Sequence, residues 1–265
     1  MTYLRRNKPV GTFFIDLIVE DQNLLRNNID CYRELSLLGS EIDLLTDLIY
    51  SYTNVENENL STDDEIINWT FPDVIDDLIS AIWNIYSGLY KTSASCLRNA
   101  YEISFVSLYL QIRENMNLKN PTNKYNIYYS EWDKGETKTP SWGITKPIVK
   151  KNPNIINYDK KRSCNIVEEG YSWFSFLCNF THSRPFDKSL DNTNAIPTNS
   201  MNIGVGFDVK NFESFIDYSK VTISWIATFW SLCFPEIFKK TPLDEFRILF
   251  NGSRGIDVYK YISKK

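Results

Sequence analysis

The stretch SASCLRNAYEISFVSLYLQIREN, residues 93–115, predicts a helix that is apolar on nearly every side. A helix without a broad polar face needs cover on all sides, so it should form the buried centre of a bundle. A second stretch of this kind covers residues 211–234 and ends in VTISWIATFWSLCF. We expect these two segments to be among the most buried parts of the chain.

Helical periodicity continues through the N-terminal third of the chain. Apolar residues recur at steps of three and four over about 20–38, and the pattern repeats over 41–53 after Gly39. The next helix is expected to begin at Asp73, because acidic residues crowd its first turn and an apolar stripe follows. Upstream of it, the segment STDDEIINW has the Thr-x-x-Glu spacing of a capping box.

The C-terminal half contains three further helical patterns. One begins near Ile166 and runs to His182, and Pro185 prevents it from continuing much further. The apolar 211–234 segment is the second. The third is short, covers about 242–250 and is expected to end at the following Asn-Gly pair.

Two irregular segments separate these patterns. Pro and Gly residues punctuate 117–163, which predicts a long loop, and 183–210 is a second loop in which MNIGVGFDV allows a short strand or hairpin arm. No internal repeat and no linker rich enough to separate domains is visible. The predicted fold class is therefore all-α, a single helical-bundle domain over 1–265 with two long loops and at most a short β-hairpin.

Composition narrows the function classes. The chain has 265 residues, is 43% hydrophobic and carries a net charge of −4, so nothing draws it as a whole to DNA or to an anionic membrane. Its longest apolar run, 221–234, is too short to span a bilayer. Five Cys without a C-x-x-C pair and a single His leave no plausible zinc set. We expect no metal, no cofactor, no membrane partner and a reducing cytoplasm.

Charge is unevenly distributed along the chain. Residues 54–90 contain eight carboxylates and no Lys or Arg, whereas 146–162 contain one acid and six basic residues, Lys146, Lys150, Lys151, Lys160, Lys161 and Arg162. One interpretation is that both segments are solvated surface. The other is that the basic segment binds RNA phosphates, or contacts the acidic segment of a second copy. The second reading predicts a homodimer.

Charged residues on an apolar helix are the sharpest functional signal in the sequence. Arg98 and Glu102 lie four residues apart, so they share a face of the central helix. Burying such a pair for stability alone is inefficient, because desolvation offsets most of the attraction. The pair is either a salt bridge that fixes helix register or part of a site.

His182, the only histidine, lies in the last turn of the 166–182 helix, on a face that also includes Tyr171. A histidine at a helix C-terminus can exchange a proton near neutral pH. Arg184 stands beside it, and a guanidinium suits phosphate recognition. The alternative role for His182 is a C-terminal cap that holds loop carbonyls.

LRNAYE (97–102) and YSWFSFLCNFTH (171–182) together resemble a pattern of bacterial helical proteins, Leu-Arg-x-x-x-Glu followed by Tyr-x-x-Leu-Ser-x-x-x-His. That group is similar in turn to the HEPN superfamily. The resemblance implies a helical fold, a phage-defence or toxin setting, metal-independent ribonuclease activity and a site of Arg98, Glu102, Tyr171 and His182. Cys178 stands where the pattern has Ser, and 175–177 lack the Arg of ribonuclease members.

Two hypotheses follow. In the first, the protein is a ribonuclease in which His182 is the general base and Arg98 or Arg184 offsets charge on the scissile phosphate. Glu102 then holds Arg98, and the basic 146–162 segment guides RNA. In the second, it is a non-catalytic helical module that senses or binds a partner protein, and the Arg-Glu-His network fixes one packing arrangement.

Overall fold

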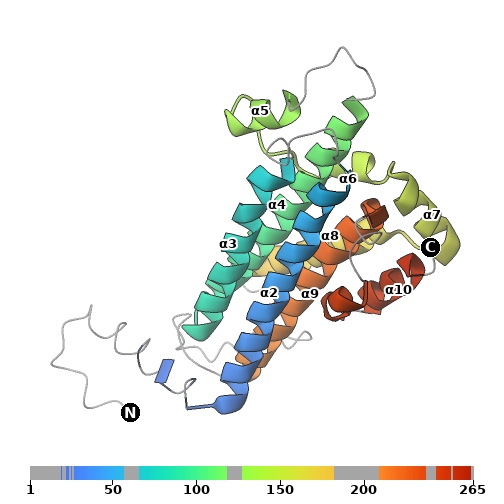
Figure 1. Cartoon of the computed structure of the whole chain (residues 1–265). Coiled ribbons are helices and arrows are strands. Elements are labelled where there is room, and N and C mark those ends of the chain that lie inside the picture. The colour runs from blue at the N-terminus through green and yellow to red at the C-terminus, as the bar shows by residue number, and fades with distance from the viewer. Residues whose placement is uncertain are drawn as a thin grey trace.

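The computed structural model describes residues 29–56, 66–117, 127–181, 209–236, 243–251 and 253–263, together with positions 19, 22, 23, 25, 27 and 28. Every regular element in these ranges is a helix, which confirms the all-α prediction. Four long helices run alongside one another, as Figure 1 shows: α2 (Ile29–Glu56), α3 (Ile66–Tyr86), α4 (Tyr90–Asn117) and α9 (Val209–Cys233).

Helix α4 is the centre of the bundle. It packs against α3, against α9 and against α8 (Ile166–Thr181). The prediction for the two most apolar segments is confirmed, because on α9 every residue from Thr222 to Cys233 except Trp225 is buried. On α4 the ring of Tyr101 and its neighbours Leu97 and Leu108 are fully buried as well. The core therefore lies where the sequence has its longest apolar runs.

In the N-terminal third, the two patterns on either side of Gly39 belong to one helix, and the helix start predicted at Asp73 is wrong. Helix α2 continues without a break through Gly39, and α3 begins at Ile66 and passes through Pro72, so Asp73 is not a helix start. Apolar residues on both sides of each position, such as Leu38 and Ile42, are buried against the same core. Their burial outweighs the roughly 1 kcal/mol that a helical Gly costs. The capping box upstream of α3 lies outside the described residues.

The prediction of a long loop over 117–163 is also wrong for its described part. This part contains α5 (Ile127–Asp133), α6 (Trp142–Val149) and α7 (Pro153–Arg162). The prolines predicted a loop wrongly because Pro153 is the first residue of α7, where a helix needs no backbone N–H donor. Asn152 caps this helix, since its side chain accepts a hydrogen bond of 2.9 Å from the Asn154 N–H.

Tertiary contacts account for α6. The ring of Trp142, at its first residue, stacks on Phe105 of α4 with ring centroids 4.0 Å apart. The second predicted loop and its short strand lie outside the described residues, except that Val209 and Lys210 already belong to α9.

The C-terminal region contains the helix predicted over about 242–250 and one that sequence reasoning missed. The first is a 3-10 helix, η4 (Leu243–Phe250), and the second is α10 (Ser253–Ile262). Both pack against α9. None of the helices in the described ranges combines the length and the apolar character that crossing a membrane requires.

Candidate functional site

Side chains from three helices form a continuous row along one face of α8, which we call the α8 strip. On α8 itself, Glu168, Tyr171 and Phe174 recur every three residues and so share a face. Helix α4 contributes an arginine and a glutamate, and α6 with its C-cap residue contributes two lysines. The members of the strip are Arg98, Glu102, Lys146, Lys150, Glu168, Tyr171 and Phe174.

The α4 end of the strip is the Arg98–Glu102 pair. Arg98 Nη2 donates to Glu102 Oε2 at 2.9 Å, and both side chains are about one quarter exposed, at 26% and 24%. The Arg98 guanidinium lies over the ring of Phe174, 5.3 Å from its centroid, so it faces α8. Among the described residues, Arg98 Nε is buried and has no hydrogen-bond partner.

The α6 end of the strip is a second set of ion pairs. Lys146 Nζ donates to both carboxylate oxygens of Glu168, at 2.9 and 3.2 Å, and Lys150 Nζ donates to Oε1 at 2.6 Å. Lys150 first, and then Lys146, holds the pKa of Glu168 below its usual value. Lys146 Nζ also lies 4.1 Å from the centroid of the Tyr171 ring, a cation–π contact.

Five predicted site residues therefore meet on the strip: Arg98, Glu102, Tyr171, Lys146 and Lys150. Tyr171 contacts Trp142, Lys146 and Phe174, and the Arg98 guanidinium lies over the ring of Phe174. His182 and Arg184 lie outside the described residues. Helix α8 is described as far as Thr181, which is seven residues, or about 10 Å of helix rise, beyond Phe174.

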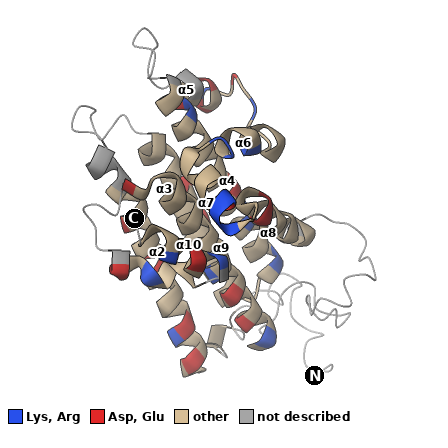
Figure 2. Cartoon of the chain, turned by 90° about the vertical axis from the view of Figure 1, so that its right-hand side faces the viewer, with Lys and Arg blue, Asp and Glu red and all other residues tan. Residues whose placement is uncertain are grey.

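The remaining predicted basic residues are Lys151, which lies between α6 and α7, and Lys160, Lys161 and Arg162 at the end of α7. Lys151 and Lys160 are exposed, and the Lys161 ammonium lies 5.2 Å from the centroid of the Tyr261 ring. Arg162 Nη2 pairs with Asp257 Oδ1 at 2.9 Å. Figure 2 shows the basic end of α7 beside acidic positions of neighbouring helices. The cations of the 146–162 segment are thus divided between the strip and the end of α7, and Lys146, Lys150 and Arg162 are already paired.

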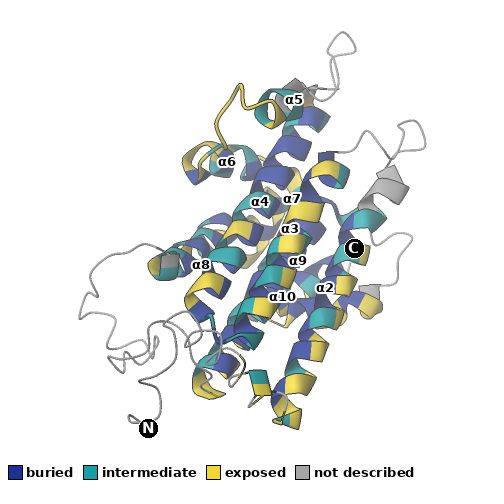
Figure 3. Ribbon diagram, turned by 90° about the vertical axis from the view of Figure 1, so that its left-hand side faces the viewer, coloured by how far each residue is buried: buried dark blue, intermediate teal, exposed yellow. Residues whose placement is uncertain are grey.

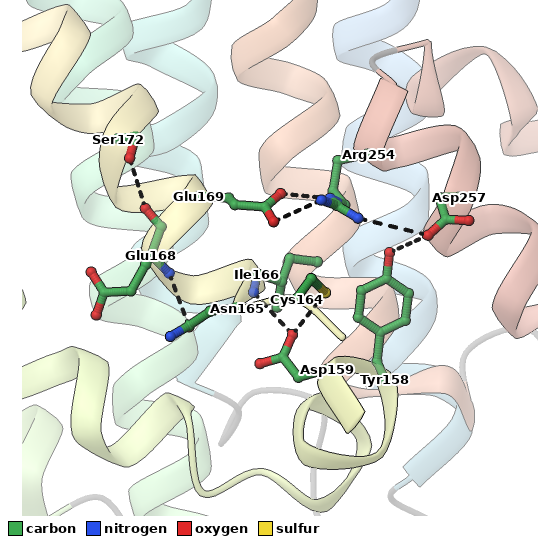
Figure 4. Close-up of polar contacts among 10 residues, drawn as sticks. All are labelled: Tyr158, Asp159, Cys164, Asn165, Ile166, Glu168, Glu169, Ser172, Arg254 and Asp257. Atoms are coloured by element: carbon green, nitrogen blue, oxygen red, sulfur yellow. Dashed lines mark hydrogen bonds and ion pairs between the residues drawn. The ribbon is translucent and has the colours of Figure 1, made fainter. Parts of the chain in front are cut away.

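A second polar network, which sequence reasoning missed, joins α7, α8 and α10 (Figure 4). Arg254 donates to both oxygens of Glu169, from Nε at 2.5 Å and from Nη2 at 2.7 Å. Asp257 accepts a bond of 2.8 Å from the Tyr158 hydroxyl, and Arg254 Nη1 lies 3.9 Å from the same oxygen. We call these residues, with Arg162, the α10 network. It attaches the C-terminal helix to the bundle.

Cys164 lies beside this network at the turn between α7 and α8. Its thiol donates to Asp159 Oδ1 at 3.3 Å, and the same oxygen accepts from the Ile166 N–H at 2.9 Å (Figure 4). Burial, and then the hydrogen bond to Asp159, raises the pKa of Cys164 to about 11. The protonated thiol is a structural donor here and a poor nucleophile. In the described ranges no three His, Cys, Asp or Glu residues are grouped as metal ligands.

The α10 network was missed because its members are far apart in the chain. Glu169 and Arg254 are separated by 85 positions, and neither stands in a motif. The one local signal is the three-residue spacing of Arg254 and Asp257, which places both on one face of a helix.

The fold and the two networks define a class of protein: an all-α bundle in which two groups of ion-paired side chains join neighbouring helices. Comparison with family models, with curated proteins and with solved structures gave no match.

Proposed function

We propose that this protein is a non-catalytic helical module of a bacterial phage-defence or toxin system, and that it acts in the cytoplasm by binding a partner. The α8 strip then serves to fix the packing of α4, α6 and α8. Recognition of the partner takes place elsewhere on the surface.

The observation that carries this proposal is the pairing of the cations on the strip. Arg98 is bonded to Glu102, and Lys146 and Lys150 both bond to Glu168. A scissile phosphate needs positive charge that is free to receive it. On this strip an anion would compete with a carboxylate for each cation, and it would meet these carboxylates as like charges.

The defence or toxin setting rests on the likeness of LRNAYE and YSWFSFLCNFTH to the motifs of HEPN-type proteins. The missing Arg at 175–177 agrees with a member that has lost or never had nuclease activity. A polar network kept for packing would also account for a charged pair on the most apolar helix of the chain.

A metal-independent ribonuclease is the second candidate, and one observation favours it. Arg98 Nε is buried with no hydrogen-bond partner among the described residues, so the guanidinium retains a donor for an anion. Helix α8, which Arg98 faces, leads along the chain to His182. In this candidate His182 is the general base toward a ribose 2′-hydroxyl, and Arg98 or Arg184 offsets charge on the phosphate.

Incubating the purified protein with total RNA in EDTA separates the two functions. We expect the wild type not to cleave RNA. We also expect a His182→Gln variant to keep the full defence or toxin activity in cells. Gln can replace the hydrogen bonds of a structural His, although it takes up no proton near neutral pH. Cleavage that falls by about 100-fold in a folded His182→Ala variant would overturn the proposal in favour of the ribonuclease.

A further inference from the structure

The outward side of α3 presents large apolar residues to solvent. Trp69, Ile79 and Trp83 are exposed, Trp83 to 63%, and they share one side of the helix with Pro72, Asp73 and Asp76, which are also exposed. We call these six residues the α3 face. Figure 3, which views the molecule from this side, shows the exposed stripe along α3. Apolar side chains grouped on an outer helix face mark an interaction site.

The α3 face is also acidic. Helix α3 contains Asp73, Asp76 and Asp77 and has neither Lys nor Arg. Burial, with smaller contributions from Asp73 and Asp76, raises the pKa of Asp77 to about 6. A cationic partner surface would relieve the repulsion among these three carboxylates, so charge selects a basic partner for the α3 face.

A surface of the complementary kind lies on the opposite side of the molecule. Ile144 on α6 and Ile156 on α7, the next helix along the chain, are 55% and 50% exposed. Lys151 between the two helices and Lys160 on α7 are exposed as well. Ile156 and Lys160 lie four residues apart and share the outer side of α7. We call these four residues the α7 face. It combines exposed isoleucines with lysines for which no carboxylate lies within ion-pair distance in the described part of the chain.

We propose that the α3 face of one copy of this chain docks on the α7 face of a second copy. The two faces match in character, because each presents apolar side chains beside charges of one sign, and the signs are opposite. Trp83, the most exposed of the three aromatic or aliphatic residues on the α3 face, is the natural anchor of the contact.

The positions of the two faces fix the geometry of the assembly. Helix α3 lies at one side of the bundle and α7 at the other (Figure 1), so both faces of one copy cannot contact the same second copy. A two-fold dimer through reciprocal contacts is therefore ruled out for this pairing. Each copy added leaves one α3 face and one α7 face free, so the contact is head-to-tail and builds rings or open chains. This inference goes beyond the proposed function and does not rest on the α8 strip.

Light scattering over a series of protein concentrations tests the geometry. We expect an average mass that rises past two copies as concentration rises, and that falls as salt is added, since the charges are exposed. A mass that stays at one copy at every concentration, or one that levels off at two, overturns the head-to-tail contact.

Zero-length carbodiimide cross-linking identifies the surfaces. The reagent joins a carboxylate to a lysine in direct contact, so Asp73 or Asp76 should couple to Lys151 or Lys160. The experiment uses a mixture of isotopically labelled and unlabelled protein, and we expect these links between labelled and unlabelled chains. Links that join other surfaces, with none between these residues, overturn the proposal.

Paired variants then test the contact by complementation. Ile79→Ser with Trp83→Ser removes the apolar part of the α3 face, and Ile144→Ser with Ile156→Ser removes that of the α7 face. Each double variant should be monomeric, while an equal mixture should form a pair and stop there, because one intact face of each kind remains. All four substituted residues are exposed, so both double variants should keep the melting temperature of the wild type.

The matched control is Ile248→Ser, which alters an exposed isoleucine of η4 that belongs to neither face. We expect this variant to assemble like the wild type. The proposal is overturned if Ile248→Ser disrupts assembly equally, or if the mixture of the two double variants stays monomeric.

Discussion

Two Arg–Glu pairs in this molecule have similar exposure and different origins. Arg98 and Glu102 lie four residues apart within α4 and are 26% and 24% exposed, whereas Arg254 and Glu169 join α10 to α8 and are 31% and 36% exposed. The first pair needs only the helix in which both residues lie. The second exists only when two residues 85 positions apart in the chain, on different helices, come together.

This difference has energetic consequences. A pair within one helix is already close in any state that keeps the helix, so breaking it changes the free energy of unfolding little. A bidentate pair between helices is formed only in the folded state, and it orients α10 relative to α8. The α10 network should therefore contribute more to stability than the Arg98–Glu102 pair, although only the latter belongs to a recognisable motif.

Glu41 extends this comparison to a carboxylate that is more buried than either pair. It is 3% exposed on α2, and burial raises its pKa to about 7, with Lys220 opposing the shift and Glu34 adding to it. Because the folded state holds the Glu41 proton more tightly, the contribution of this residue to stability falls as pH rises from about 4.5 to about 7. Glu41→Gln should remove this loss and be up to about 3 kcal/mol more stable than the wild type at about pH 8.

Urea unfolding at about pH 5 and about pH 8 measures this effect. The matched control is Asp43→Asn, an exposed carboxylate on the same helix, which should leave the pH dependence unchanged. Equal pH dependence in the wild type and in Glu41→Gln would contradict the prediction.

Gly170 directly follows Glu169 of the inter-helix pair on α8. A Cβ at this position would stand 2.6 Å from Phe229 Cε2 and 2.7 Å from the Tyr101 hydroxyl oxygen, so α4, α8 and α9 meet too closely there for a side chain. Gly170→Ala should lower the free energy of unfolding by roughly 1–3 kcal/mol through overpacking.

The control for this substitution is Gly39→Ala in α2, where a Cβ meets nothing within 4 Å. This variant should be more stable than the wild type by roughly 0.5–1 kcal/mol, because Ala costs less than Gly in a helix. Denaturant unfolding of both variants measures the two effects. A Gly170→Ala variant at least as stable as the wild type would show that packing at Gly170 is not tight.

A double-mutant cycle measures the Arg254–Glu169 pair directly. The free energy of unfolding is compared for the wild type, Arg254→Ala, Glu169→Ala and the double variant. We expect a coupling of about 1–2 kcal/mol, as for a charge-assisted bidentate pair that spans two helices. A coupling near zero would mean that the Arg254–Glu169 pair does not help to hold α10 on α8.

The same cycle on Arg98 and Glu102 should give a smaller coupling. Exposed pairs at this spacing contribute about 0.3–0.5 kcal/mol, and Arg before Glu is the less favourable order. A value equal to that of the Arg254–Glu169 pair would remove the distinction between a local and a tertiary ion pair in this molecule.

Much of the fold was predictable because apolar periodicity is a local property. The helical character of 93–115, 166–181 and 211–233 followed from residues within each segment. Within the site, the Arg98–Glu102 pair was predictable for the same reason. The prolines of 146–162 predicted a loop wrongly, because Pro153 can begin a helix as readily as it ends one.

The sequence by itself determined the all-α class, the two helices that occupy the core and the charged pair on α4, since these depend on neighbours within a few turns. Only the tertiary structure decided that α2 and α3 continue unbroken through Gly39 and Pro72. It also decided that Glu168 forms ion pairs with Lys146 and Lys150, and that Glu169 pairs with Arg254. Those outcomes depend on which helix faces lie together. That arrangement is set by burial over the whole chain, and no short stretch of sequence contains it.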